Sequence, residues 1–233
     1  MTGNYFLDAL KPETADAVRA ILQPVDLADG DVLIHQEAEV AIVHFPTSAQ
    51  LSNITVLPSG DHLETAVIGK EGLSGLAPFM ASAPCAWRVV STVGGSAWAA
   101  PAEDLRALSD RLPDLRVRLL ALTHFYQAQA NQLALCNTYH RAPSRLARWL
   151  LMTSDLTGVS ELRMTQEQIA NALGVQRTAM VEAFGALKAE GLIKHTRARM
   201  AILDRAGLRR RACGCYAQLH RMALSLGILP GNR

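Results

Sequence analysis

The amino-acid sequence predicts an α+β fold, with strands in its first half and helices in its second half. Short apolar runs separated by turn residues occupy about residues 22–101, which is the pattern of a strand-rich domain. From Glu103 onward the apolar residues recur every three or four positions, which is the spacing of helices. We therefore expect a β-roll, then a long helix, then a helical C-terminal domain.

Turn signals divide the N-terminal region into strands. Residues 29–30, Asp-Gly, form a strong turn signal, and residues 58–61, Pro-Ser-Gly-Asp, separate two apolar runs as a hairpin requires. The predicted strands include residues 32–34, 51–57, 62–68, 87–93 and 96–100. With a short helix at its start, this β-roll is assigned to residues 1–105.

A regular stripe follows within residues 106–140, where the spacing alternates between four and three. This heptad pattern is typical of a helix that packs along its length against a parallel copy or another long helix. We predict a dimerisation helix here. Its predicted interface residues are Leu115, Leu119, Leu122, Tyr126, Gln129, Leu133 and Cys136. The alternative is that the same stripe packs on the β-roll of its own subunit.

The charge of the chain is divided unevenly. Residues 1–140 hold 8 Lys and Arg against 15 Asp and Glu, whereas residues 141–233 hold 15 against 6. Clustered Lys and Arg are needed to neutralise phosphates, so the basic part is where a polyanion would bind. A solvated basic surface is the alternative. Pro143 cannot supply a helical N–H and ends the long helix, which places a hinge at residues 141–144 and the C-terminal domain at 145–233.

Two short helices joined by a tight turn are expected in the basic part. Residues 165–168, Thr-Gln-Glu-Gln, have the form of a capping box that starts the first helix. Gly174 suits the left-handed turn that ends it. The second helix begins near Gln176, and its outward residues are the candidates for contacting bases: Arg177, Thr178, Val181 and Glu182.

Such a helix pair could be an ordinary structural hairpin, but the residues after it favour another interpretation. A basic strand-turn-strand pattern follows Ile193, and a basic β-wing beside a helix-turn-helix is suited to holding a nucleic-acid backbone. The candidate phosphate contacts are Arg145, Thr165, Gln166, Gln176, Lys188, Arg197 and Arg199.

Three segments, 164–178, 187–193 and 202–208, resemble the C-terminal helix-turn-helix of Crp/Fnr-type regulators. The order of the predicted domains also matches that family. The resemblance implies a cyclic-nucleotide-binding-like β-roll and a homodimer that regulates transcription by binding a near-palindromic duplex DNA through the recognition helix 176–189. RNA polymerase is a further candidate partner. Arg177 matches the family's base-contacting arginine, whereas Thr178 and Glu182 depart from its best-known members, so a different operator is expected.

The effector cannot be named from the sequence. Cyclic-nucleotide-binding members hold the cyclic phosphate with an arginine, and the corresponding place here is taken by Cys85 and its neighbour Ala86. A buried phosphate without its counter-charge is severely penalised, so cyclic AMP is not expected to bind. Iron–sulfur relatives use an N-terminal cysteine group, and no cysteine precedes Cys85. We expect no cofactor.

Other classes of protein have little support. Residues 72–75, Gly-Leu-Ser-Gly, lack the last glycine of a nucleophile elbow, so no enzyme is predicted. Cys213 and Cys215 with His220 suggest a metal site, but the cysteine spacing is unusual and a packing stripe is expected instead. No apolar run approaches a membrane span, and the cytoplasm is the expected location. The remaining alternative is a ligand- or redox-sensing module whose helix pair binds protein.

Overall fold

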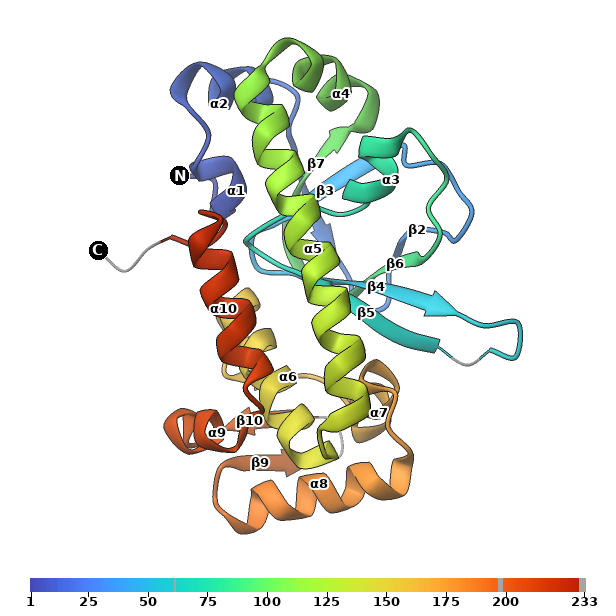
Figure 1. Ribbon diagram of the computed structural model, residues 1–233, viewed down its shortest axis with the longest axis vertical. Coiled ribbons are helices and arrows are strands. Elements are labelled where there is room, and N and C mark those ends of the chain that lie inside the picture. Colours follow the sequence, from blue (N-terminus) through green and yellow to red (C-terminus); the bar gives the residue numbers. More distant parts are fainter. Residues whose placement is uncertain (61, 197–198, 231–233) are drawn as a thin grey trace.

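The computed structural model describes residues 1–60, 62–196 and 199–230. Figure 1 shows a strand-rich N-terminal domain, one long helix beside it, and a helical C-terminal domain with a small sheet. The predicted α+β fold class is therefore confirmed. Among the helices of the described residues, none combines the length and apolar character that crossing a lipid bilayer requires.

Two antiparallel sheets form the β-roll. One contains β1 (Gln23–Leu27), β7 (Gly95–Pro101) and β3 (Ile42–Pro46), in that order. The other contains β2 (Val32–Ile34), β6 (Arg88–Val93), β4 (Gln50–Val56) and β5 (His62–Ile68). The predicted hairpin is the pair β4 and β5, in which Leu51 lies opposite Ile68. The core of this domain includes the fully buried side chains of Val43, Phe45, Leu51 and Val89.

Five helices pack on or beside this core: α1 (Tyr5–Asp8), α2 (Pro12–Arg19), α3 (Leu76–Ala81), α4 (Ala102–Arg111) and α5 (Pro113–Tyr139). The region predicted as one long helix over 106–140 is therefore interrupted. Leu112 has extended backbone angles, and Pro113 occupies the first turn of α5. Proline suits that position because its ring fixes φ, and it disfavours a helical residue before it.

The predicted dimer stripe packs inside its own chain. Leu115, Leu119 and Leu122 are fully buried against the β-roll. The rest of the stripe is 2–9% exposed or fully buried in the single chain, and consists of Tyr126, Gln129, Leu133 and Cys136. These residues cannot meet a second subunit without leaving the core, so the prediction that they form the dimer interface is wrong. The alternative, packing on the subunit's own β-roll, is what the structure shows for the stripe from Leu115 to Gln129, whereas Cys136 packs against Cys213 and Cys215.

The C-terminal domain begins earlier than the sequence predicts. α6 (Ala142–Thr157) starts directly after Arg141, and Pro143 lies in its first turn. Proline is tolerated there because the first helical N–H groups have no intrahelical partner. The connection between α5 and α6 therefore reduces to His140 and Arg141, and the expected hinge over 141–144 is mostly helical. A connection this short limits how far the two helices can move apart.

The rest of this domain has the winged arrangement that the sequence predicts. Its helices are α7 (Gln166–Leu173), α8 (Arg177–Ala189), α9 (Arg205–Arg211) and α10 (Cys215–Ser225). Its strands are β8 (Glu161–Leu162), β9 (Ile193–Thr196) and β10 (Arg199–Ile202), in the sheet order β8-β10-β9. In Figure 1, α8 lies at the end of the molecule farthest from α2 and α4, and α10 runs beside α5.

The two domains contact each other directly, at a surface that we call the domain junction and that comprises Leu63, Glu64, Trp149 and Gly174. α7 packs on β5, and a Cβ atom on Gly174 would lie 2.5 Å from Leu63 Cδ1. Trp149 of α6 donates its indole N–H to Oε1 of Glu64 at 3.0 Å. Both Trp149 and Glu64 are buried, so the junction contains a buried polar contact.

Candidate nucleic-acid interface

The first helix of the candidate interface starts at a complete capping box. The backbone N–H of Gln168 donates to Thr165 Oγ1 at 3.2 Å, and the Thr165 N–H donates to Gln168 Oε1 at 2.8 Å. Two of the N–H groups that a helix start leaves unpaired are satisfied in this way. The sequence prediction of this helix start is confirmed.

The turn after α7 depends on a left-handed residue. Gly174 has φ +57° and ψ 44°, a conformation that side chains with a Cβ rarely adopt. A side chain here would also require the Leu63 side chain to move. The predicted glycine turn is confirmed, and it fixes the angle at which α8 leaves α7.

One side of α8 is anchored in the core and the other is exposed. Met180, Ala183, Phe184 and Leu187 are 0–3% exposed and pack against α6, α7 and the wing. Opposite them lie the exposed side chains of Arg177, Thr178, Val181 and Glu182. Four residues predicted to contact bases therefore share one accessible face. A helix held rigidly from behind with a free outer face can enter a major groove.

Five of the candidate phosphate contacts are exposed or partly exposed. Gln176 is the N-cap of α8, its side chain is exposed, and it makes no capping hydrogen bond. Lys188 and Arg199 are exposed, and Arg199 pairs with Glu161 at 3.3 Å. Thr165 and Gln166 are partly exposed at the start of α7. Arg197 lies outside the described residues.

Arg145 is placed differently from the sequence expectation. Its side chain is buried, and its guanidinium donates to Asn137 Oδ1 at 2.8 Å and to the carbonyl of Leu173. The Leu173 carbonyl is one of the groups that the end of α7 leaves unpaired. In this arrangement Arg145 joins α5, α6 and the helix-turn-helix, and its guanidinium is not available to a phosphate.

Comparisons with known proteins agree with this geometry. Residues 144–211 match the family model of the Crp-like helix-turn-helix domain. The structure matches a Crp/Fnr-family transcriptional regulator of Eubacterium rectale, with 19% identity, a TM-score of 0.69, and coverage of 91% of this chain and 99% of that one. It also matches FixK2 of Bradyrhizobium japonicum, with 15% identity, a TM-score of 0.70, and coverage of 83% and 98%. The search of curated proteins gave no match.

A third solved structure, the c-di-GMP-responsive regulator CLP of Xanthomonas campestris, aligns with 14% identity and a TM-score of 0.66 over 82% of this chain and 99% of that one. The chain has the Crp/Fnr fold, with a Crp-like helix-turn-helix domain. The resemblance inferred from the sequence is confirmed at this level. At these identities the solved structures support the fold alone.

The β-roll of this Crp/Fnr fold contains a cavity of about 320 Å³ against α5. Its volume falls at the small end of the range for ligand sites, about 300–1,000 Å³. The described residues that line it carry no formal charge: Asn53, Thr65, Ala66, Ile68, Leu76, Ala77, Trp87, Thr123, Tyr126, Gln127 and Ala130. Asn53 Oδ1 and Trp87 Nε1 are buried and have no hydrogen-bond partner among the described residues.

Cys85 occupies an apolar place in the same domain. Its side chain is fully buried, and its backbone N–H donates to the Ala38 carbonyl at 2.8 Å. Burial raises the pKa of the Cys85 thiol, which keeps it in the neutral form. The place where the family resemblance expects a cationic phosphate ligand therefore holds an uncharged thiol.

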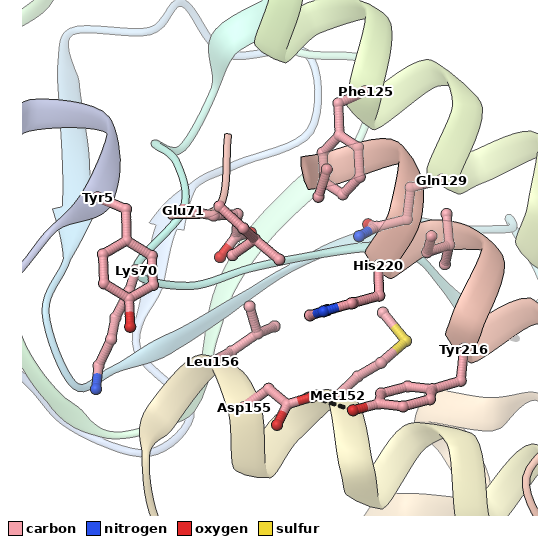
Figure 2. Close-up of a pocket in the computed structure, with 13 residues that line it drawn as sticks. Tyr5, Lys70, Glu71, Phe125, Gln129, Met152, Asp155, Leu156, Tyr216 and His220 are labelled. Atoms are coloured by element: carbon pink, nitrogen blue, oxygen red, sulfur yellow. Dashed lines mark hydrogen bonds between the residues drawn. The ribbon is translucent and has the colours of Figure 1, made fainter. Parts of the chain in front are cut away.

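A second cavity, of about 70 Å³, lies between the β-roll, α5, α6 and α10 (Figure 2). Tyr216 donates its hydroxyl to Asp155 Oδ2 at 2.6 Å along one wall, and His220 lies nearby. Ligand sites for small molecules are several times larger, so this space suits a few water molecules. His220 stacks on Tyr216, with ring centroids 6.4 Å apart.

Glu71 lines this small cavity, and its carboxyl is expected to make stability depend on pH. Burial raises its pKa from 4.5 to about 7, although the Gly69 N–H donates to both of its oxygens. Between these pH values the folded protein holds a proton that the unfolded chain releases, so the free energy of unfolding falls as the pH rises. A pKa shift of this size corresponds to about 3 kcal/mol of unfolding free energy.

Urea unfolding of the wild type and of Glu71→Gln, measured from pH 4.5 to 8, checks this prediction. The variant lacks the titration, whereas Glu64 and His44, whose pKa values burial shifts to about 7 and about 4, contribute to both proteins. The difference between the two curves therefore isolates Glu71. Glu103→Gln at an exposed position serves as the control. Parallel curves for the wild type and Glu71→Gln would contradict the expectation.

Proposed function

We propose that this chain is a sequence-specific DNA-binding transcription regulator that acts as a homodimer. The observation that carries the proposal is the exposed face of α8, on which Arg177, Thr178, Val181 and Glu182 lie above a buried anchor. Arg177 can make a bidentate contact with guanine, Glu182 can accept from cytosine N4, and Thr178 can touch a thymine methyl group. Gln176, Lys188 and Arg199 are assigned to the flanking phosphates.

Selection of bound sequences from random duplex DNA tests this function. We expect a near-palindromic operator whose half-sites lie about 34 Å apart, one helical turn. Binding should weaken steeply as the salt concentration rises, because each neutralised phosphate releases counterions. The alternative function, a sensing module whose helix pair binds protein, predicts no enriched sequence and no salt-sensitive DNA binding.

The dimer is assigned to the outer side of α5. This outer stripe is spaced three or four residues apart and consists of Val117, Leu120, His124, Gln127, Asn131 and Leu135. Val117 is 64% exposed, Leu120 52% and Leu135 48%. Exposed apolar residues at heptad spacing along a helix of 27 residues, about 40 Å long, suit packing against a second copy of the same helix.

Leu120→Glu is expected to convert the dimer to a monomer, because it places a charge within the apolar contact between the paired outer stripes. Sedimentation or light scattering over a range of concentrations measures the change. Leu57→Glu is the matched control, since Leu57 is 57% exposed but lies after β4, away from α5. If Leu120→Glu assembles like the wild type, the outer stripe is not the dimer contact.

The effector is proposed to be an uncharged molecule that occupies the 320 Å³ cavity, rather than a cyclic nucleotide. The uncharged lining and the buried neutral Cys85 support this, because a cyclic phosphate bound there would lack a cationic partner. Titration calorimetry with cyclic AMP and cyclic GMP is expected to detect no binding. Saturable binding of either nucleotide would contradict the proposal.

A further inference from the structure

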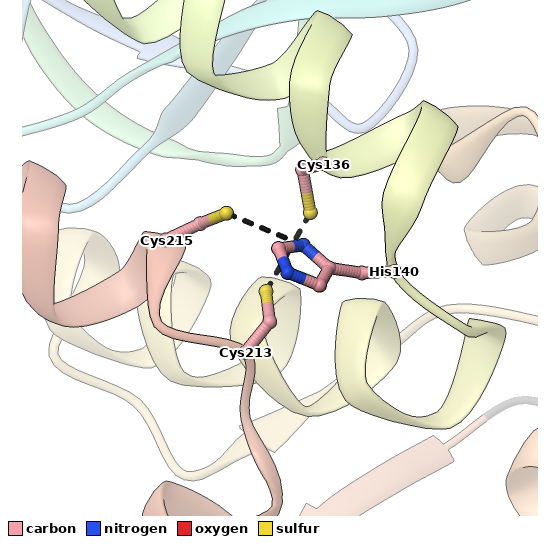
Figure 3. A group of neighbouring side chains, drawn as sticks. All are labelled: Cys136, His140, Cys213 and Cys215. Carbon is pink, nitrogen blue, oxygen red and sulfur yellow. Dashed lines mark hydrogen bonds between the residues drawn. The ribbon is translucent and has the colours of Figure 1, made fainter.

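Four side chains with metal-binding atoms meet at the connection between the two domains. Cys136 and His140 lie one turn apart at the end of α5, Cys213 lies between α9 and α10, and Cys215 is the first residue of α10. Figure 3 shows all four pointing toward a common centre. Their three sulfur atoms and one ring nitrogen lie within 4.8 Å of one another. This group, which we call the Cys3His cluster, is brought together from segments more than 70 residues apart.

Two of the separations within the cluster are close to those of a tetrahedral zinc site. The sulfur atoms of Cys136 and Cys213 are 3.5 Å apart, and Cys215 Sγ lies 3.5 Å from His140 Nδ1. Zinc bonds of about 2.3 Å to sulfur and about 2.0 Å to nitrogen place neighbouring ligand atoms roughly 3.5–3.8 Å apart. No separation in the cluster exceeds 4.8 Å, so side-chain rotations that shorten the longest of them would place all four atoms around one ion.

The surroundings suit a site with negative charge. Arg148 of α6 is 2% exposed, and its Nε has no hydrogen-bond partner among the described residues. The positive charge of Arg148 lies close enough to Cys136 and Cys213 to interact electrostatically with both. Three thiolates and one neutral imidazole around Zn²⁺ carry a net charge of −1, which the buried Arg148 would offset.

The cluster also has an outer hydrogen bond of the kind that orients metal ligands. The side-chain amide of Gln132 donates to Cys215 Sγ at 3.0 Å. Such outer donors fix the direction of a ligand and tune its charge. The thiols are shielded as well, since Cys136, Cys213 and Cys215 are 0%, 8% and 2% exposed. Packing alone accounts for buried cysteines, but it does not account for a histidine ring directed at the centre of three thiols.

We propose that Cys136, His140, Cys213 and Cys215 bind a zinc ion in a closed, tetrahedral, structural site. Four protein ligands leave no open position, which is the arrangement of structural rather than catalytic zinc. The ion would tie the end of α5 to the start of α10 across the short α5–α6 connection. It would thereby fix how the C-terminal domain sits on the long helix.

Metal analysis of the full chain, purified under reducing conditions and dialysed against metal-free buffer, tests this proposal. We expect one zinc per chain in the wild type and in Cys85→Ala, whose buried thiol lies in the β-roll. Cys136→Ala and Cys213→Ala should contain less than a tenth of that amount. Cys215→His keeps four ligands and should retain one zinc per chain, which distinguishes a lost ligand from a misfolded variant.

Cobalt provides a second measurement on the wild type alone. Reduced, metal-free protein titrated with Co²⁺ should show the absorption of a tetrahedral thiolate complex, complete at one ion per chain, and Zn²⁺ should abolish it. The proposal is overturned if the reduced wild type takes up neither ion stoichiometrically, or if Cys136→Ala and Cys213→Ala bind as the wild type does. A Cys136–Cys213 disulfide whose reduced form takes up no metal would identify a redox pair instead.

Discussion

Arg177→Ala is expected to remove most of the protein's preference for its operator over random DNA. Arg177 is the first residue of α8, and its side chain is exposed. It forms no ion pair with another of the described residues. A bidentate contact from arginine to guanine contributes about 1–3 kcal/mol of discrimination. In a symmetric dimer the contact occurs twice, so the expected loss is about 2–6 kcal/mol, or roughly 30-fold to 2 × 10⁴-fold in selectivity.

Competition binding between the selected operator and a scrambled duplex measures this selectivity at one salt concentration. Arg111→Ala is the matched control, because Arg111 is exposed on α4 and distant from α8. The control should bind as the wild type does. Affinity for scrambled DNA should change little in Arg177→Ala, since phosphate contacts supply non-specific binding. If Arg177→Ala keeps the selectivity of the wild type, Arg177 does not contact bases.

The parts of this fold that the sequence predicts correctly are those set by neighbouring residues. The capping box at Thr165 and the left-handed turn at Gly174 each depend on a few adjacent positions, and both are present. The outer face of α8 follows from helical periodicity in the same way. For this reason local sequence patterns are sufficient to outline the candidate interface, apart from Arg145.

Arg145 and α5 show where local patterns are insufficient. Two stripes on α5 have heptad spacing, one that begins at Leu115 and one that begins at Val117. The sequence favours the more apolar stripe as the dimer contact, but in the structure that stripe is buried within its own chain. A search for a second, less apolar stripe at the same spacing would have found the outer one. Arg145 likewise resembles a surface cation until α5 and Leu173 are seen beside it.

The Cys3His cluster is a long-range feature that spacing alone could not reveal. The sequence suggests His220 as the partner of Cys213 and Cys215, whereas the structure brings Cys136 and His140 to them. Helical periodicity does contain a signal, because residues four apart on a helix share one face. A cysteine and a histidine at that spacing on α5 are therefore a candidate pair, but only the packing of α10 on α5 identifies the other two residues.

Trp149→Ala is expected to be the most destabilising single substitution at the domain junction. Trp149 is 1% exposed and packs within the core of the C-terminal domain. Truncating a buried tryptophan leaves a large cavity and costs about 3–5 kcal/mol. It also removes the indole N–H that donates a hydrogen bond to Glu64 across the junction at 3.0 Å. Glu64 then keeps only the hydrogen bond from the Ser52 hydroxyl, at 2.6 Å, among its side-chain donors in the described residues. Urea unfolding measures the total loss of unfolding free energy.

Trp149→Phe separates the two contributions. It preserves most of the packing but leaves Oε1 of the buried Glu64 without its donor, which is expected to cost about 1–3 kcal/mol. Trp98→Phe is the matched control, because Trp98 is only partly buried and donates to the Thr2 carbonyl at 3.1 Å, where water can replace it. If Trp149→Phe costs no more than Trp98→Phe, the bond to Glu64 does not stabilise the junction. If it costs more, the junction is held by a buried polar contact as well as by apolar packing.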